Sequence, residues 1–475
     1  MTEATTVQIV SLGCARNDVD SDELAARLEA GGFRIVAEGE SAEAVLVNTC
    51  GFIDAAKKDS IDTLLAASDA RDEGVKAVVA VGCMAERYGR DLGDSLPEVD
   101  AVLGFDAYPD IASRLRGIMA GERPTSHIPH DRRQLLPLAP LSRPAAAASV
   151  IVPGMGEALH ATGPTGPASG PRVLRRRLAG GPSAPLKIAS GCDRRCAFCA
   201  IPSFRGAFVS RPSADIVTEA RWLVEQGVRE VLLVSENTSS YGKDLGEARA
   251  LERLIADLSG VDGLEWIRVS YLQPAEIRPS LIEAMCATDK VVPYFDLSFQ
   301  HASGPLLRRM RRFGDDQSFL ALLDGIRTLA PNAGIRSNVI VGFPGETDKD
   351  FETLVRFAEA ARLDALGVFG YSDEEGTEGA TLDGHVSQAV IDERYEELAS
   401  LVDQLLDARA EERVGERVRV LIEAPDGTGR AEHQAPETDG STQITGAAAV
   451  PGEFVWGRVT GHEGVDLMAV AEAQS

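Results

Sequence analysis

Short apolar runs alternate with longer amphipathic stretches over most of the chain, and this alternation predicts an α/β architecture. Near the N-terminus, three runs rich in Val and Ile predict strands at residues 7–12, 44–49 and 75–82. Helical spacing fills the intervals, in SDELAARLEAGG, with Ser21 as the expected N-cap and Gly31 as the expected stop, and in FIDAAKKDSIDTLLAASDA. This order of elements predicts an N-terminal domain with a small parallel sheet over residues 5–120.

The middle of the chain repeats the same strand–helix pattern. Strands are predicted at residues 186–190, 230–235, 266–271, 294–299, 335–341 and 365–371. Helices are predicted at residues 214–226, 248–259, 279–288, 303–312, 316–329 and 348–362. Six parallel strands with outer helices predict a partial (β/α)6 barrel over residues 185–411, with its chemistry at the carboxyl ends of the strands.

The remaining two regions have different patterns. RVRVLIEA, QITGAAAV and FVWGRVTG alternate apolar and polar positions with turn residues between them, which predicts a small antiparallel β-barrel over residues 412–475. Residues 131–184 are rich in Pro, Ala and Gly without a steady period, which is typical of a linker. Within it, RVLRRRL at residues 172–178 is a small basic island that we interpret as a solvated loop.

The composition is that of a globular protein, with 44% hydrophobic and 25% charged residues. No apolar run is long enough to span a bilayer, and residues 1–9 lack a signal-peptide pattern. We therefore expect a cytoplasmic protein with reduced cysteines and no membrane partner. Seventy-three acidic residues against 48 basic ones give a formal net charge of −25. Such a charge disfavours a polyanionic partner and favours a basic one.

One short stretch, KIASGCDRRCAFCAIPSFRGAFVSRP at residues 187–212, concentrates residues that carry chemistry. Cys192, Cys196 and Cys199 follow a predicted strand in C-x3-C-x2-C spacing. Three thiolates so spaced can bind three irons of one cubane cluster and leave the fourth iron open to a small molecule. A structural zinc site would need a fourth ligand, and no His or further Cys lies nearby. A disulfide with a spare thiol is disfavoured in a reducing compartment, so we interpret the stretch as an iron–sulfur site.

Three further cysteines end the N-terminal strands, in the pairs Gly13-Cys14, Thr49-Cys50 and Gly82-Cys83. The carboxyl ends of parallel strands share one edge, where ligands bind, so these three thiols are expected to converge. Three independent buried thiols are the alternative, because cysteine is often buried. We favour a second three-Cys cluster. Cys286 lies in a helical pattern and is interpreted as a packed core thiol.

The motif around residue 192 resembles the signature of radical S-adenosylmethionine (radical SAM) enzymes. Its form is C-x3-C-x-aromatic-C, in which Phe198 directly precedes the third cysteine. The resemblance implies a [4Fe-4S] cluster whose open iron binds the amino and carboxylate groups of S-adenosylmethionine. One-electron reduction then cleaves this cofactor to a radical that abstracts hydrogen.

The sequences around the N-terminal cysteines resemble methylthiotransferases, in SLGCARNDVDSDEL, VNTCGFIDAAKKDSID and VGCMAERY. The form NTCGFI-x2-AK-x2-SI is similar to the RimO family, the branch that acts on a ribosomal protein. The implied activity is methylthiolation of an aspartate β-carbon on protein twelve of the small ribosomal subunit. It implies two [4Fe-4S] clusters, two molecules of S-adenosylmethionine used in different ways, and an electron donor.

The same resemblance places other strand ends near the cofactor. Glu236, in SENTSSYG after the second barrel strand, stands where methylthiotransferases usually have Gln. Gly342, Gly345 and Glu346 belong to the VGFPGE loop after the fifth strand, which by family analogy lies against bound S-adenosylmethionine. The two glycines are expected to permit close backbone approach to a ligand.

The C-terminal barrel resembles, by its position, a TRAM domain, a module that often binds RNA. From Arg413 onward it carries five arginines against ten acidic residues. Binding a phosphate backbone relies on an excess of Lys and Arg, so this segment favours a basic ribosomal protein over tRNA. We expect Glu432, Glu437 and Asp439 to form an acidic docking patch.

Two other functions are weighed against this one. A tRNA-adenosine methylthiotransferase is disfavoured by the acidic tail and by the sequence Gln-His-Ala-Ser at residues 300–303, which resembles the ribosomal-protein branch. A non-catalytic iron–sulfur protein that uses its tail for recognition leaves the spacing of the three cysteines near residue 192 unexplained.

Overall fold

The computed structural model describes residues 4–135, 175–436 and 438–472, which form two compact units. The first unit contains the described residues up to Gly180 together with 189–194 and 200–209. The second contains 181–188, 195–199 and the described residues from Ser210 onward. Most of the linker predicted at residues 131–184 lies outside the described residues.

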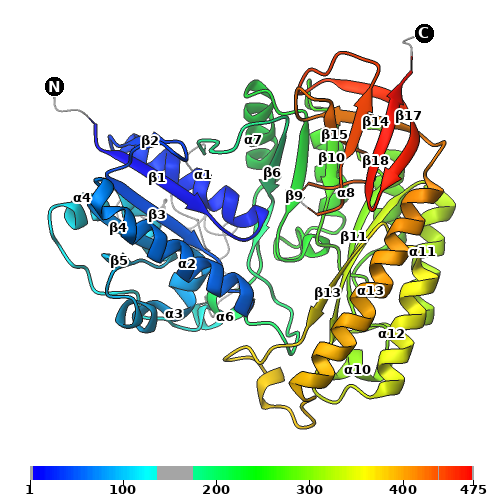
Figure 1. Ribbon diagram of the computed structural model, residues 1–475, viewed down its shortest axis with the longest axis horizontal. Helices are drawn as coiled ribbons and strands as arrows, with labels where there is room; N and C mark the ends of the chain where they lie inside the picture. The colour runs from blue at the N-terminus through cyan, green and yellow to red at the C-terminus, as the bar shows by residue number, and fades with distance from the viewer. Residues whose placement is uncertain (1–3, 136–174, 437, 473–475) are drawn as a thin grey trace. The chain divides into compact units, whose positions relative to one another are not determined.

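The first unit is built on a five-stranded parallel sheet in the order β2-β1-β3-β4-β5 (Figure 1). Its strands are β1 (Thr6–Ser11), β2 (Arg34–Val36), β3 (Ala44–Thr49), β4 (Ala77–Val81) and β5 (Ala101–Val102). Its helices are α1 (Ala15–Ala30), α2 (Asp54–Asp69), α3 (Gly82–Ser95), α4 (Ile111–Met119) and α6 (Ile201–Arg205). The predicted parallel sheet is confirmed, and the short strands β2 and β5 extend it at its two edges. A hydrophobic cluster packs on each face of the sheet.

The start of α1 differs from the prediction. The helix begins at Ala15, directly after Cys14, whereas Ser21 was expected to be the N-cap. Ser21 instead lies inside the helix, fully buried, and its hydroxyl accepts a hydrogen bond from the Asn48 side chain at 2.8 Å. The first turns of α1 bury polar side chains, so apolar periodicity begins later than the helix itself. Gly31 is confirmed as the helix stop.

The described residues at both ends of the predicted linker contact the first unit. At its start, the 3₁₀ turn at Arg132–Leu135 places the Arg132 guanidinium against the buried carboxylate of Glu86. Near its end, Arg175 is only 3% exposed and lies 3.6 Å from Asp22. The interpretation of the basic island as a solvated loop is therefore wrong for Arg175, because Arg175 is buried and its charge lies beside the buried carboxylate of Asp22.

The second unit contains six parallel strands that follow one another in chain order, as predicted. Two three-stranded sheets, β6-β9-β10 and β11-β12-β13, are joined by an isolated bridge between Leu272 and Leu297. The strands are β6 (Ser183–Lys187), β9 (Glu230–Val234), β10 (Trp266–Val269), β11 (Tyr294–Gln300), β12 (Gly334–Val341) and β13 (Ala365–Gly370). The first predicted strand is split, because Ala189–Ser190 forms a separate short strand, β7, that pairs with β8 (Val209–Ser210).

The helices of this six-stranded core match the predicted positions closely. They are α7 (Ser213–Glu225), α8 (Ala250–Ser259), α9 (Pro279–Ala287), α10 (Gly304–Arg309), α11 (Asp316–Leu329) and α12 (Asp348–Ala361). A further helix, α13 (Gln388–Glu412), is 25 residues long and was not predicted. It packs against β13 and α12 and buries Leu398 and Val402 (Figure 1). Leu398, Val402 and Leu405 recur at helical spacing in its sequence, so the pattern did carry a signal for this helix that the prediction left unused.

The C-terminal segment forms a closed five-stranded barrel in the order β14-β15-β16-β18-β17. Its strands are β14 (Arg417–Ile422), β15 (Thr428–Ala431), β16 (Thr442–Thr445), β17 (Phe454–Glu463) and β18 (Asp466–Ala471). The prediction of a small barrel is confirmed. The pairing is antiparallel except between β16 and β18, which run parallel, so the expectation of a wholly antiparallel barrel was too simple.

Buried charges attach this C-terminal barrel to the six-stranded core. Glu230 is fully buried at the start of β9 and accepts hydrogen bonds from Arg268 of β10, at 2.7 Å, and from Arg430 of β15. Burial alone would raise the pKa of Glu230, but the two arginines lower it to about 2. Trp266 packs edge-on against Phe454 beside this group. The charged contact and the apolar contact together fix the barrel on the core.

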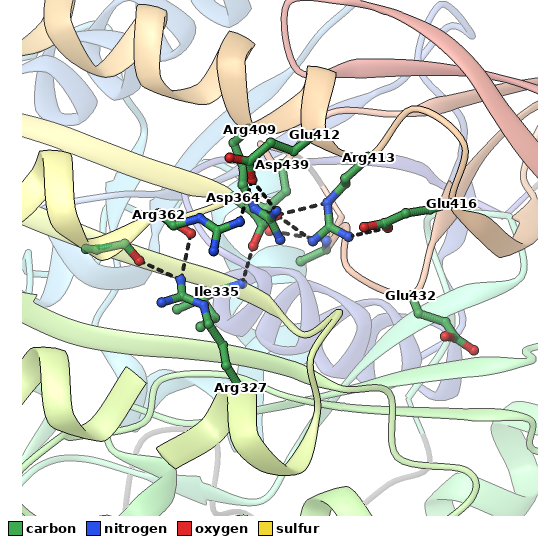
Figure 2. A network of polar contacts seen from close by, with 12 residues as sticks. Arg327, Ile335, Arg362, Asp364, Arg409, Glu412, Arg413, Glu416, Glu432 and Asp439 are labelled. Atoms are coloured by element: carbon green, nitrogen blue, oxygen red, sulfur yellow. Dashed lines mark hydrogen bonds and ion pairs between the residues drawn. The ribbon is translucent and has the colours of Figure 1, made fainter. Parts of the chain in front are cut away.

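A second carboxylate has the same arrangement near the end of α13. The Asp364 carboxylate accepts hydrogen bonds from Arg409, in α13, and from Arg413, which directly follows this helix (Figure 2). The distances from Nε to the carboxylate oxygen are 3.1 and 3.0 Å. Asp364 also accepts a hydrogen bond from the backbone N–H of Ile335 at 2.9 Å. The carboxylate therefore joins the end of α13 to the sheet.

The two described residues of the expected acidic docking patch do not form an exposed acidic surface. Asp439 is buried, and its carboxylate accepts hydrogen bonds from Arg336 at 2.8 Å and from the Tyr294 hydroxyl. Glu432 is only partly exposed, and burial raises its pKa. Glu437 lies outside the described residues. Counting charges in the sequence could not distinguish acids used inside the barrel from acids on its surface.

We predict that Glu230→Gln lowers the free energy of unfolding by about 3–5 kcal/mol, because it leaves two buried guanidinium groups without their shared carboxylate. In the wild type, the contribution of Glu230 should be lost as the pH falls from 4.5 towards about 2, since its folded pKa is depressed. Urea unfolding followed by tryptophan fluorescence measures both effects. The control is Glu247→Gln, whose pair with Arg253 is exposed and worth at most about 1 kcal/mol. Equal losses for the two variants would contradict the prediction.

Candidate functional site

Three cysteines meet at one edge of the N-terminal sheet. Cys14 is the N-cap residue of α1, Cys50 directly follows β3, and Cys83 is the second residue of α3, directly after β4. The strands β1, β3 and β4 are neighbours in the sheet. Parallel pairing places their carboxyl ends at the same edge, and the expected convergence of the three thiols is present.

Glycines before two of these cysteines allow the close approach. Gly13 has φ +100°, and a side chain there would come within 3.0 Å of the Cys50 sulfur. Gly82 has φ +91°, and a side chain there would overlap Asn48 on the neighbouring strand. Both positions therefore require glycine for backbone conformation and for space.

The three thiols sit in different electrostatic environments. Burial would raise the pKa of Cys14, but the positive charges of Arg16 and Arg205 outweigh it and lower this pKa. Burial raises the pKa of Cys50, and the neighbouring Cys14 adds to the effect. Burial also raises the pKa of Cys83 to about 12, against the opposing charge of Arg205. Arg205 thus acts on all three thiols, and the charge of Cys14 acts on Cys50 and Cys83.

Arginines donate hydrogen bonds to two of the sulfurs. The Nε of Arg16 lies 3.4 Å from the Cys14 sulfur. Arg205 places Nε at 3.3 Å and Nη2 at 3.0 Å from the Cys83 sulfur. Neither arginine was predicted from the sequence. Arg16 was within reach, since it follows Cys14 by two positions, whereas nothing local in the sequence connects Arg205 with a cysteine 122 positions away.

The C-x3-C-x2-C loop lies between β7 and α6, and its residues are divided between the two units. In the first unit, the backbone N–H of Cys192 donates to the Gly206 carbonyl at 3.0 Å. In the second, the N–H of Cys199 donates to the Cys196 carbonyl at 3.2 Å, and an Arg312 guanidinium N–H lies 3.6 Å from the Cys196 sulfur. Phe198 is partly buried against the hydrophobic core of that unit.

The donor set suits iron–sulfur clusters. All seven cysteines of the chain are free thiols. Across the described ranges, no three His, Cys, Asp or Glu side chains converge on a single metal ion. A cubane takes each thiolate at a different iron, so it does not require such convergence. Cys286 packs against the core of the second unit, as expected.

The VGFPGE loop is held by contacts within the chain. Glu346 is 6% exposed, and its carboxylate accepts hydrogen bonds from the Gly342 N–H at 2.9 Å and from Arg394 at 2.8 Å. Gly342 and Gly345 both have positive φ. A side chain at Gly342 would overlap Ile391, and one at Gly345 would lie 2.7 Å from Arg309.

The glycines at positions 342 and 345 therefore leave room for the side chains of Ile391 and Arg309. The contact of this loop with a cofactor stays a prediction. Glu236, the other predicted cofactor contact, lies two residues after Val234, the last residue of β9, and is 9% exposed. The buried side chain of His301 lies beside Glu346, with 3.5 Å between its Nε2 and the Glu346 carboxylate.

Three family models match successive parts of the chain. Residues 6–104 match the uncharacterized protein family UPF0004, residues 186–358 match the radical SAM superfamily, and residues 414–471 match the TRAM domain. The first and third ranges cover the N-terminal sheet and the C-terminal barrel, and the second covers the six-stranded core up to α12, before β13. Among the described residues, no helix is both long and apolar enough to cross a membrane.

Solved structures show the same fold at low sequence identity. A radical S-adenosylmethionine methyltransferase, TsrM from Kitasatospora setae, was solved with cobalamin and a [4Fe-4S] cluster bound. It matches with a TM-score of 0.52 at 14% identity, over 78% of this chain and 75% of that one. At this identity the likeness concerns the fold alone.

Curated relatives match nearly the whole chain. The ribosomal protein uS12 methylthiotransferase RimO of Cutibacterium acnes is 64% identical, over 98% of this chain and 97% of its own. The enzymes of the same name from Kineococcus radiotolerans and Streptomyces coelicolor are each 58% identical, over 98% and 99% of this chain and 96% and 97% of their own. The chain therefore belongs to the RimO family of radical SAM methylthiotransferases.

Proposed function

We propose that this chain methylthiolates the β-carbon of an aspartate residue in ribosomal protein uS12, using S-adenosylmethionine and two [4Fe-4S] clusters. The observation that carries the proposal is the presence of two separate sets of three free cysteines in a chain of the RimO family. The β-carbon of an aspartate has no acidity that a general base could use at neutral pH. Radical chemistry supplied by a cofactor is suited to such a bond.

The two sets of cysteines would hold one cluster each. Cys14, Cys50 and Cys83 would bind the first cluster, and Cys192, Cys196 and Cys199 would bind the second. Each set leaves one iron without a protein ligand and open to a small molecule. When bound, the second cluster supplies the electron that cleaves S-adenosylmethionine, and the first holds the sulfur that is transferred.

Other residues of the chain would position these groups. Arg312 would donate to the Cys196 thiolate, and Phe198 would shield the loop from water through its packing on the core. Glu346 would keep the VGFPGE loop in one conformation through Gly342 and Arg394, so that backbone groups of the loop could receive the cofactor. Glu236, in the loop that follows β9, would contact the cofactor directly.

The surface of the C-terminal barrel would contribute to partner choice. Exposed acids of the barrel include Glu453 and Glu463, and the whole chain carries a net charge of −25. A basic ribosomal protein would be attracted to this surface and an RNA backbone repelled. This charge balance disfavours the tRNA-modifying alternative.

After anaerobic reconstitution, we expect about eight irons per chain, the content of two cubanes. The Cys192→Ala/Cys196→Ala/Cys199→Ala variant should keep about four irons, and so should the Cys14→Ala/Cys50→Ala/Cys83→Ala variant. Cys286→Ala is the control and should keep all of them, because Cys286 belongs to neither set. Iron and acid-labile sulfide are measured on the purified chains. Wild-type protein that saturates at four irons would refute the second cluster.

The two sets of cysteines should fail in different ways. Loss of the second set should abolish reductive cleavage of S-adenosylmethionine, measured as 5′-deoxyadenosine. Loss of the first set should preserve cleavage and abolish methylthiolation of uS12, measured by mass spectrometry of the ribosomal protein. Cells that lack the chain and are complemented with each variant provide the same test in vivo. A normal rate of methylthiolation by the Cys14→Ala/Cys50→Ala/Cys83→Ala variant would disprove the assignment.

The docking surface is tested by charge reversal at exposed acids. Glu453→Lys/Glu463→Lys should slow association with uS12 several-fold at low salt, and the difference should shrink as salt screens the charges. Glu359→Lys/Glu396→Lys, which reverses two exposed acids on α12 and α13, is the charge-matched control. Association rates are measured against ionic strength, with 5′-deoxyadenosine formation as a check of integrity. Equal slowing by both pairs would show that only net charge matters and that docking lies elsewhere.

A further inference from the structure

A buried guanidinium faces the sulfur of Cys83 from the segment that follows the C-x3-C-x2-C motif. Arg205 is the last residue of α6, belongs to the first unit and is 3% exposed. Its Nε and Nη2 lie 3.3 and 3.0 Å from the Cys83 sulfur. Two nitrogens of one planar guanidinium group thus donate to the same sulfur.

The orientation of this guanidinium is fixed from several sides. Its Nη2 lies 2.7 Å from the Asn17 side-chain oxygen and 3.0 Å from the Asp20 carboxylate, both on α1. Asn17 is itself held, because its amide nitrogen donates to the Leu12 carbonyl at 2.8 Å. The guanidinium carbon also lies 5.3 Å from the centre of the Phe105 ring, which covers it from one side. The side chain therefore has one well-defined position beside Cys83.

A cluster at this edge would place negative charge where water is scarce. Cys83 is 7% exposed, and a metal-bound thiolate carries negative charge that burial disfavours. Each added electron increases that charge. The reduction potential of an iron–sulfur cluster depends on net charge and on hydrogen bonds to its sulfurs, and residues that contact the ligands without binding metal set both.

We propose that Arg205 is a positioning residue for the N-terminal cluster, which orients the Cys83 thiolate and stabilises the reduced state of the cluster through a charged hydrogen bond. The proposal rests on the assignment of Cys14, Cys50 and Cys83 as ligands. Under this proposal α6, which follows the radical SAM motif, also contributes a residue to the surroundings of the N-terminal cluster.

A purely structural role makes different demands on the residue. If Arg205 only neutralised Asp20, a lysine would serve nearly as well, because an isolated charge needs no fork geometry. Contact of Nε and Nη2 with one sulfur requires the planar guanidinium, which lysine lacks. Substitution by lysine therefore separates the two roles.

The experiment uses the full chain with Cys192→Ala/Cys196→Ala/Cys199→Ala, so that only the N-terminal cluster is present. Arg205→Met and Arg205→Lys are made in this background. The matched control is Arg132→Met, because Arg132 is also buried in the first unit, also pairs with a buried acid and also flanks the Phe105 ring. The described ion pairs of Arg132 are with carboxylates, those of Glu86 and Asp106, and not with a cysteine sulfur. Iron content and the reduction midpoint potential, followed by electron paramagnetic resonance, are the readouts.

The expected result is a more negative midpoint potential for Arg205→Met, a smaller negative shift for Arg205→Lys, and little change for Arg132→Met. Loss of iron by Arg205→Met while Arg132→Met keeps about four irons would also support the proposal. If both methionine variants lose iron, the lysine variant decides, and a parental potential for it would overturn the proposal. Equal potentials for all variants would overturn it as well. A parent that binds no iron would reject the ligand assignment itself, a failure distinct from that of Arg205.

Discussion

Parallel pairing of β1, β3 and β4 is the constraint on which the N-terminal site depends. Because the strands run in one direction, residues at their carboxyl ends meet at one edge even though they are more than thirty positions apart in sequence. The register pairs Ser11 with Asn48 and Asn48 with Val81, which aligns the three strand ends. A cysteine placed just beyond each end then faces the same space. Antiparallel pairing would send alternate strand ends to opposite edges and separate the thiols.

Buried carboxylates between pairs of arginines have a comparable role in the second unit. Glu230 accepts hydrogen bonds from Arg268 and Arg430. Asp364 accepts hydrogen bonds from Arg409 and Arg413 (Figure 2). Desolvation makes such groups poor sources of net stability, yet loss of one member leaves the others charged and buried. Each group therefore allows one arrangement of the elements it joins, and the C-terminal barrel is held on the core by fixed geometry as well as by apolar contact.

Much of this organisation could be predicted from sequence, because its signals are local or follow simple rules. Strand–helix alternation predicted the N-terminal sheet and the six-stranded core, and alternation of apolar and polar positions predicted the C-terminal barrel. The parallel-edge rule predicted that Cys14, Cys50 and Cys83 converge. The failures have a common cause in tertiary contacts that leave no local signal. The polar side chains of α1 are buried against neighbouring strands, so the helix began earlier than its apolar pattern suggested. Asp439 was counted as a surface charge although Tyr294 and Arg336 enclose it. Arg205 reaches Cys83 across 122 positions.

The glycines beside the cysteines make the N-terminal site vulnerable through residues that have no chemistry of their own. Gly13 and Gly82 contribute only the absence of a side chain, and a methyl group at position 13 would occupy space now taken by the Cys50 side chain. With Cys14, Cys50 and Cys83 as the proposed ligands, natural variation at either glycine would disturb their geometry while all three cysteines remained in the sequence. An inspection of the cysteines alone would class such a chain as intact. The sequence requirement of the site thus includes more than the three cysteines, because positions 13 and 82 must also lack a side chain.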